Sequence, residues 1–88
     1  LDSLKNLLKN HPQEDSTQVD ILTDLAFRFY QTSIDSTLFF AKKAYQLAEK
    51  INYERGKGRS LGRIALGYST KGDYISALDN YLKSLTIG

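Results

Sequence analysis

The chain has 88 residues, of which 41% are hydrophobic and 25% are charged, and its formal net charge is +2. This size and composition indicate one small folded domain rather than a disordered chain. The nearly balanced charge argues against a nucleic-acid binder, which concentrates Lys and Arg on one face. The chain has no cysteine, which excludes disulfides and thiolate catalysis. No apolar run reaches the roughly 20 residues that cross a bilayer, so we expect no nucleic-acid partner and no membrane contact by this segment.

Helical periodicity runs along the whole chain, with apolar residues recurring at every third or fourth position. Four leucines predict a first helix over residues 1–10, which ends before Pro12 because proline disfavours helix at the preceding residue. A second helix is expected over roughly residues 17–31, with Asp15 or Ser16 as its N-cap.

Turn-forming residues separate the remaining three helices. The segment QTSIDS precedes a third predicted helix over about residues 34–51, and YERG precedes a fourth. Gly72 then suits a left-handed C-cap, and Asp73 suits the N-cap of a fifth helix that begins at Tyr74. No segment alternates apolar and polar residues as a strand does. The sequence therefore predicts an all-α fold of about five helices.

The segment ERGKGRSLGRIALG, residues 54–67, combines glycines with basic residues in the manner of a phosphate-binding loop. A dinucleotide fingerprint follows a buried strand, however, and a P-loop places Ser or Thr directly after Gly-Lys. Here an amphipathic helix precedes the glycines, and Gly58 follows Lys57. We therefore keep a nucleotide-binding protein only as a minor alternative. We expect Gly58, Gly62 and Gly67 to lie where a neighbouring backbone approaches too closely for a Cβ.

The chain also contains an internal repeat. LTDLAFRF at residues 22–29 aligns with LGRIALGY at residues 61–68, and STLFFAKKAYQLA at residues 36–48 aligns with SALDNYLKSLTIG at residues 76–88. A helix pair therefore recurs after about 40 residues, a period typical of solenoid proteins.

This repeat resembles the tetratricopeptide repeat (TPR). The second copy carries the resemblance best, with the helix spacing of the family followed by GDY at residues 72–74, Ala77 and Tyr81. The long period and these signatures are similar to the long-helix TPR repeats of bacterial sensor histidine kinases and related regulators. The resemblance implies a right-handed superhelical stack of antiparallel helix pairs. The single domain, residues 1–88, then divides into an N-terminal helix over 1–11, a first repeat over 17–51 and a second repeat over 54–88.

The resemblance also implies a groove, lined by the first helix of each pair, in which peptides or helices of a partner protein bind. Carried over residue by residue, this groove comprises Asp20, Thr23, Asp24, Phe27 and Tyr30 of the first copy and Arg59, Gly62, Arg63, Leu66 and Ser69 of the second. Phe27, Tyr30 and Leu66 are candidate anchors, because the core does not require apolar side chains there. The two aspartates align with the two arginines on neighbouring helices, and we favour charge pairing between them over ligand binding.

The fifth helix carries an apolar stripe that is broader than one neighbouring helix requires. Leu78, Leu82 and Leu85 belong to it. They predict either further repeats in a longer parent chain or a homodimer through this helix. A start at Leu1 rather than at methionine agrees with a fragment of a longer chain.

No catalytic constellation emerges from the sequence. His11 has no second histidine nearby, and the serines lack a histidine that would activate them as nucleophiles. We therefore predict no enzyme, no cofactor and no metal site. The predicted function is a protein-protein interaction module, in the sensing or scaffolding part of a bacterial signal-transduction protein. The alternative is a structural or dimerising spacer without a ligand. The sequence leaves the compartment open between a periplasmic sensor and a cytoplasmic adaptor.

Overall fold

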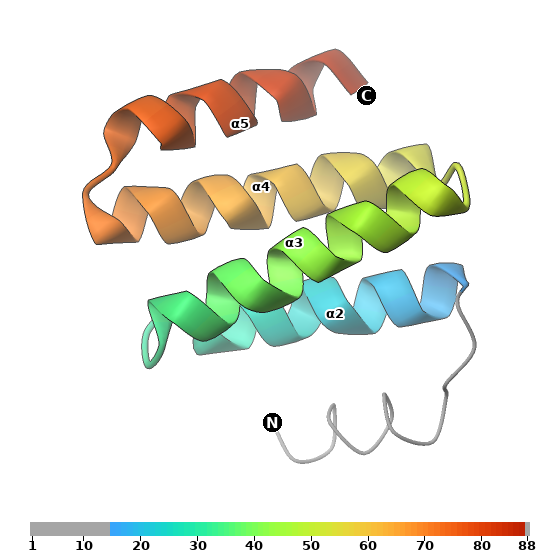
Figure 1. Ribbon diagram of the computed structural model, residues 1–88, viewed down its shortest axis with the longest axis horizontal. Coiled ribbons are helices and arrows are strands. Elements are labelled where there is room, and N and C mark those ends of the chain that lie inside the picture. Colours follow the sequence, from blue (N-terminus) through green and yellow to red (C-terminus); the bar gives the residue numbers. More distant parts are fainter. Residues whose placement is uncertain (1–14, 88) are drawn as a thin grey trace.

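The computed structural model describes residues 15–87, which form four α-helices in two antiparallel hairpins (Figure 1). The first pair consists of α2 (Ser16–Phe29) and α3 (Ile34–Lys50), and the second pair consists of α4 (Glu54–Lys71) and α5 (Tyr74–Ile87). These helices confirm the all-α prediction, and their bounds lie close to the expected ones. The predicted helix over residues 1–10, together with His11, lies outside the described residues.

Short polar side chains and one glycine set the helix ends. The Asp15 carboxylate accepts a hydrogen bond from the N–H of Gln18 at 3.1 Å and caps α2, which confirms the first of the two predicted caps. Between α4 and α5, Gly72 adopts the left-handed conformation with a φ of 93°. The Asp73 carboxylate then accepts from the N–H of Ser76 at 3.1 Å. The turn between the last two helices is therefore built as predicted.

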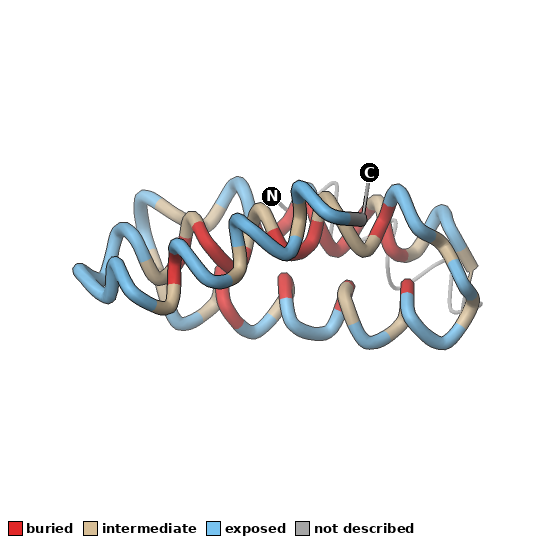
Figure 2. Tube along the Cα trace, turned by 90° about the horizontal axis from the view of Figure 1, so that it is seen from above, coloured by how far each residue is buried: buried red, intermediate tan, exposed pale blue. Residues whose placement is uncertain are grey.

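The core lies between α2, α3 and α4. Of the described helices, α4 packs against both members of the first pair, whereas α5 packs against α4 alone. One buried cluster joins Ala26, Leu38 and Ala41 of the first pair to Leu61 and Ile64 of α4. Figure 2 shows the buried positions where the helices face one another. Only one residue of α5 is buried among those whose side chains the structure describes, so this helix forms an outer layer.

The glycines of residues 54–67 lie within α4 rather than in a loop, so the segment lacks the loop that a phosphate site requires. At Gly67 a Cβ would lie 2.7 Å from Leu38 Cδ2 of α3, so Leu38 would have to shift to admit one, and the close neighbour is a side chain and not the expected backbone. The same expectation was wrong for Gly62, where no neighbouring atom of the described residues lies within 4 Å of the Cβ position. At Gly58 the nearest atom, 3.8 Å away, makes only an ordinary contact.

Candidate partner-binding site

The predicted groove residues lie on α2 and α4, which pack against each other, and at Tyr30, directly after α2. Arg59 of α4 lies between two carboxylates of α2, with one guanidinium nitrogen 3.6 Å from Asp20 and the other 3.7 Å from Asp24. Because all three side chains are partly exposed, each pair adds only about 0–1 kcal/mol to the stability of the fold. The expected charge pairing is confirmed for Arg59. It is wrong for Arg63, which forms no ion pair with any described residue.

Arg63 lies instead over the ring of Phe27. Its guanidinium carbon is 4.7 Å from the ring centroid, and its Nε donates to the carbonyl oxygen of Thr23 at 3.4 Å. Burial lowers the pKa of Arg63, and the charge of Arg59 lowers it further. The guanidinium stays protonated at neutral pH because its ordinary pKa is so high. The charge of the Asp24 carboxylate partly offsets this lowering of the pKa. The face formed by α2 and α4 therefore holds a partly desolvated cation that lies near Asp24 but forms no ion pair with it.

Two aromatic side chains lie at the C-terminal end of α2. Phe27 is 46% exposed, and its ring centroid is 5.3 Å from that of Tyr30. Together with Asp24, Arg28 and Gln31 they line a cleft of about 520 Å³. Exposed aromatic surface bordered by polar groups is typical of protein-binding sites.

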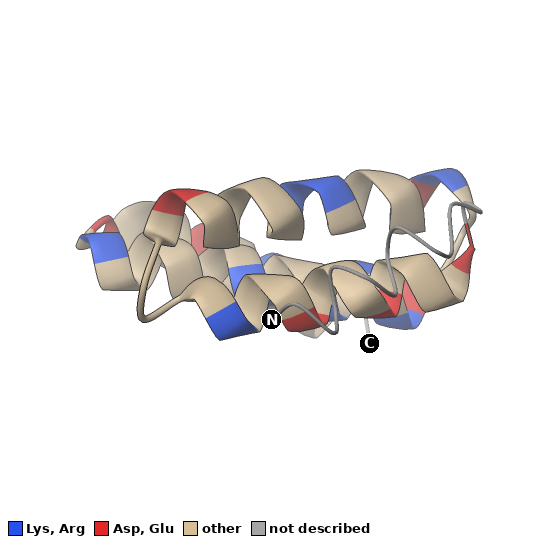
Figure 3. Ribbon diagram, turned by 90° about the horizontal axis from the view of Figure 1, so that it is seen from below, with Lys and Arg blue, Asp and Glu red and all other residues tan. Residues whose placement is uncertain are grey.

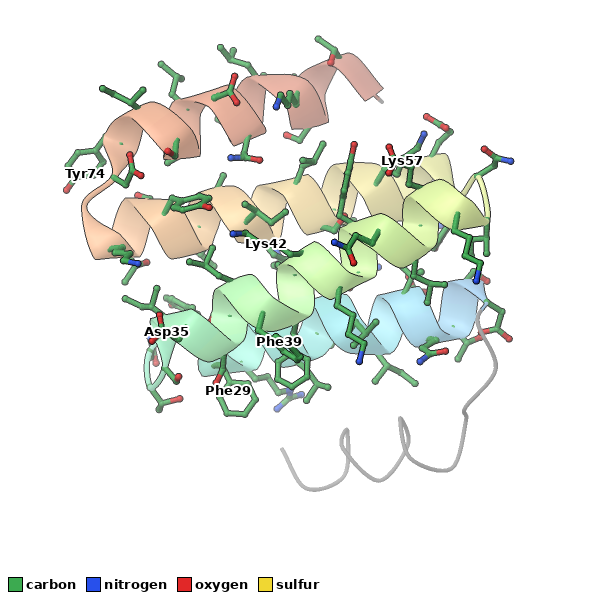
Figure 4. All side chains as sticks on the ribbon, in the orientation of Figure 1. Phe29, Asp35, Phe39, Lys42, Lys57 and Tyr74 are labelled. Atoms are coloured by element: carbon green, nitrogen blue, oxygen red, sulfur yellow. The ribbon has the colours of Figure 1, made fainter. Side chains whose placement is uncertain are left out.

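A second cleft, of about 550 Å³, adjoins the first and was not predicted from the sequence. It is lined by residues 30–35, which follow α2, and by Thr70 and Lys71 at the end of α4. Asp35, labelled in Figure 4, lies at this end of the helix stack. Tyr30 and its neighbour Gln31 line both clefts, so the two clefts share a wall. The turn composition of the loop was visible in the sequence, but its proximity to the end of α4 follows only from helix packing.

Not every predicted groove residue reaches this surface. Thr23 is fully buried, and its hydroxyl donates to the carbonyl oxygen of Asp20 at 2.9 Å, which corrects the prediction that its side chain lines the groove. Leu66 and Ser69 line a separate cleft between α4 and α5. Of the predicted groove residues, Asp24, Phe27 and Tyr30 thus line the cleft at the end of α2, whereas Leu66 and Ser69 line the cleft between α4 and α5.

Asp20 has a second partner besides Arg59. It accepts a hydrogen bond from the hydroxyl of Tyr53 at 3.0 Å. Burial raises the pKa of Tyr53, and the hydrogen bond to Asp20 and the charge of its carboxylate raise it further. Tyr53 therefore remains a neutral donor at physiological pH and holds the Asp20 carboxylate in place beside α4.

Charges of both signs are mixed over the described surface. Figure 3 shows acidic and basic residues interspersed along the helices instead of separated by sign. Within residues 15–87, no three His, Asp or Glu side chains come together to hold a metal ion. Nor does any helix in that range have the length and apolar character needed to span a membrane.

Comparison with known proteins gives a match over almost the whole chain. A family model described as the SusR N-terminal TPR domain matches residues 1–86. No curated protein and no solved structure matches the chain. The match covers both helix pairs, and the arrangement of α2 to α5 agrees with a helical repeat fold.

Proposed function

Because the chain belongs to the family of SusR N-terminal TPR domains, and TPR domains are typically non-catalytic interaction modules, we propose that it binds a segment of another protein on the face formed by α2 and α4. The observation that carries this proposal is the partly exposed pair of Phe27 and Tyr30, with Arg63 over the Phe27 ring. None of these three side chains contributes to the buried core clusters.

The three side chains favour a particular ligand chemistry. Phe27 and Tyr30 offer a large apolar area and lose little conformational entropy when a ligand covers them. Arg63 donates charge-assisted hydrogen bonds to a carboxylate, and such bonds are stronger in a partly desolvated place than in water. We therefore expect a ligand segment in which an aromatic or branched apolar side chain lies close to an Asp or Glu.

Selection from a phage-displayed random peptide library tests this expectation. The chain should enrich peptides that carry an acidic residue next to an aromatic residue or leucine. Replacing both Phe27 and Tyr30 by Ala should weaken the binding of a selected peptide by about tenfold or more, because each side chain supplies buried contact area. Circular dichroism should show unchanged helicity, since both side chains are partly exposed.

Phe39→Ala is a matched control. Phe39 is 59% exposed and projects from α3 away from α4 (Figure 4). This variant should keep the full affinity for the selected peptide. If the Phe27 and Tyr30 double variant binds as tightly as the Phe39 control, the α2–α4 face is not the binding site.

We further propose that this domain is the sensing or scaffolding part of a bacterial signal-transduction protein, without enzymatic activity of its own. The similarity of its repeats to those of bacterial sensor regulators supports this context. The mass and membrane association of the native full-length polypeptide test it. A product several times larger than this domain, found in the membrane fraction, supports a sensor, whereas a short soluble product indicates a stand-alone adaptor.

A second candidate function is a dimerising spacer with no groove ligand. Three exposed leucines of α5, at 57%, 53% and 65% exposure, favour it: Leu78, Leu82 and Leu85. This function predicts a dimer at millimolar protein in light scattering and a monomer after Leu82 and Leu85 are both replaced by Ala. A monomeric mass for the unchanged chain at that concentration contradicts it.

A further inference from the structure

The two arginines on the α2–α4 face differ in their partners. Arg59 directs one terminal nitrogen at Asp20, 3.6 Å away, and the other at Asp24, 3.7 Å away. Arg63 lies one turn later on α4, and neither of its terminal nitrogens forms a hydrogen bond or an ion pair with a described residue. An anion that enters this face therefore meets one arginine that is already paired and one that is not.

The contacts of Arg63 hold its guanidinium group in place without using those two nitrogens. The group lies over the Phe27 ring, and its Nε donates to the Thr23 carbonyl oxygen at 3.4 Å. A carboxylate is bound well by two parallel N–H donors, and one guanidinium supplies both from a single side chain. Arg63 therefore binds one carboxylate without help from a second cation.

A phosphorylated residue has a different requirement. At neutral pH it carries a charge of about −1.5 to −2 and is bound well where several arginines converge. The basic residue one turn from Arg63 is Arg59, and its charge lowers the pKa of Arg63. Because both terminal nitrogens of Arg59 face carboxylates, Arg59 does not neutralise the second charge of a phosphate.

The other charges around this cleft do not replace the missing cation. Asp24 lies near Arg63 as well as Arg59, so its carboxylate repels an anion that is bound to Arg63. Arg28 lines the same cleft as Asp24, but its side chain is exposed, and an exposed, hydrated cation gains little by pairing. A dianion on Arg63 would therefore keep one charge uncompensated in a partly desolvated place.

We propose that Arg63 binds the carboxylate of an Asp or Glu in the ligand segment, and that Asp20 and Asp24, by holding Arg59, exclude a phosphorylated residue from the same place. This inference rests on the proposed function and specifies its ligand as an unmodified acidic segment. The two aspartates are thus specificity-determining residues. A ligand with phosphoserine in place of its acidic residue binds more weakly, although it carries more charge.

Two small aromatic anions serve as probes. Phenylacetate carries a carboxylate and phenyl phosphate carries a phosphate, which is mostly dianionic at about pH 7.5. Each compound is titrated into the isotopically labelled chain, and binding is followed by NMR through the side-chain Nε–H resonance of Arg63, which R63K identifies by removing it. Phenylacetate should shift this resonance saturably. Phenyl phosphate should bind at least about fivefold more weakly, because its second charge is unpaired.

Replacing both aspartates by asparagine should reverse this preference. In the D20N and D24N double variant, Arg59 has no carboxylate partner on α2, and two guanidinium groups are available to the probe. The affinity for phenyl phosphate should rise about tenfold or more. The affinity for phenylacetate should rise less, because one guanidinium is enough for a carboxylate. Adding R59Q to the double variant should remove most of the gain for phenyl phosphate.

E49Q together with D79N is the matched control. Both carboxylates are exposed, one on α3 and the other on α5. This pair of substitutions changes the net charge by the same amount as D20N with D24N but leaves the partners of Arg59 in place. The control should keep the preference for phenylacetate. Circular dichroism of each variant checks that its helices are intact.

Three results overturn the proposal. The first is phenyl phosphate that binds the unchanged chain as tightly as phenylacetate does. The second is no shift of the Arg63 resonance with either probe. The third is a gain in phosphate affinity in the E49Q and D79N control equal to that in the D20N and D24N variant, which would assign the effect to net charge.

The probes report on Arg63 without a partner peptide, so this inference and the proposed function fail separately. If a selected peptide depends on Phe27 and Tyr30 but the probes show no preference, only the inference fails. If the probes show the preference but no peptide depends on Phe27 and Tyr30, the proposed binding face fails.

Discussion

At the scale of single residues, two glycines of the same helix have opposite surroundings. A Cβ at Gly67 would lie 2.7 Å from Leu38 Cδ2 and 2.9 Å from its Cγ. Gly67→Ala should therefore lower the free energy of unfolding by about 1–3 kcal/mol through overpacking. Gly62→Ala should raise it by about 0.5–1 kcal/mol, because the Cβ enters open space and alanine favours helix more than glycine does.

Urea denaturation of the two variants and the unchanged chain measures both effects. The comparison is direct because both glycines lie inside α4 and share the same gain in helix propensity. Equal changes in the two variants would mean that Leu38 moves aside at no cost, and that Gly67 is not required by packing.

At the scale of one element, the start of α5 depends on the ionised form of Asp73. Hydrogen bonds donated by the hydroxyl and the N–H of Ser76 lower the pKa of Asp73. A carboxyl whose pKa is lower in the folded state stabilises the fold above its unfolded pKa of about 3.9. That contribution is lost as the pH falls through the folded-state pKa. The unfolding free energy should therefore decrease as the pH falls from about 5 towards 2.

Asp73→Asn isolates this contribution, because asparagine caps a helix as well as aspartate does but has no carboxyl group to titrate. At neutral pH the variant and the unchanged chain should have similar stability. As the pH falls towards 2, the unfolding free energy of the unchanged chain should decrease more than that of the variant. Asp79→Asn is the control, since Asp79 lies on the exposed side of α5, paired only with Lys83. If the unfolding free energies of the Asp73 variant and the unchanged chain fall in parallel with pH, the Asp73 carboxylate does not contribute this pH dependence.

At the scale of the whole molecule, the four helices are unequally supported. α4 packs against three described helices, whereas α5 packs against one and buries a single residue among those described. Elements with few buried apolar contacts open at lower free energy than the core does. Native-state hydrogen exchange should therefore show the amides of α5 exchanging faster than those in the middle of α2, α3 and α4. Uniform exchange across all four helices would instead mean that the two pairs open as one cooperative unit.

Much of this architecture follows from local features of the sequence. Apolar residues spaced by three and four predict helices, and the turn residues around Gly72 and Asp73 mark a boundary between two of them. The recurrence of a helix pair after about 40 residues can be read by aligning the sequence with itself. They predicted the described helices, most of their ends and the TPR family. The surface stripe of α5 was predicted for the same reason, since the breadth of an apolar stripe can be counted along one helix.

Only the tertiary structure decided which side chains share a surface. Thr23 and Phe27 are one turn apart on α2, yet the first is fully buried and the second is half exposed beside Arg63. The rotation and offset of the helices against one another also bring the loop after α2 to the end of α4, and they place Phe27 and Leu66 in different clefts. Helical periodicity fixes the side of a helix that faces the core. The placement of groups at the edge of that side depends on contacts between residues distant in the chain, which no local pattern encodes.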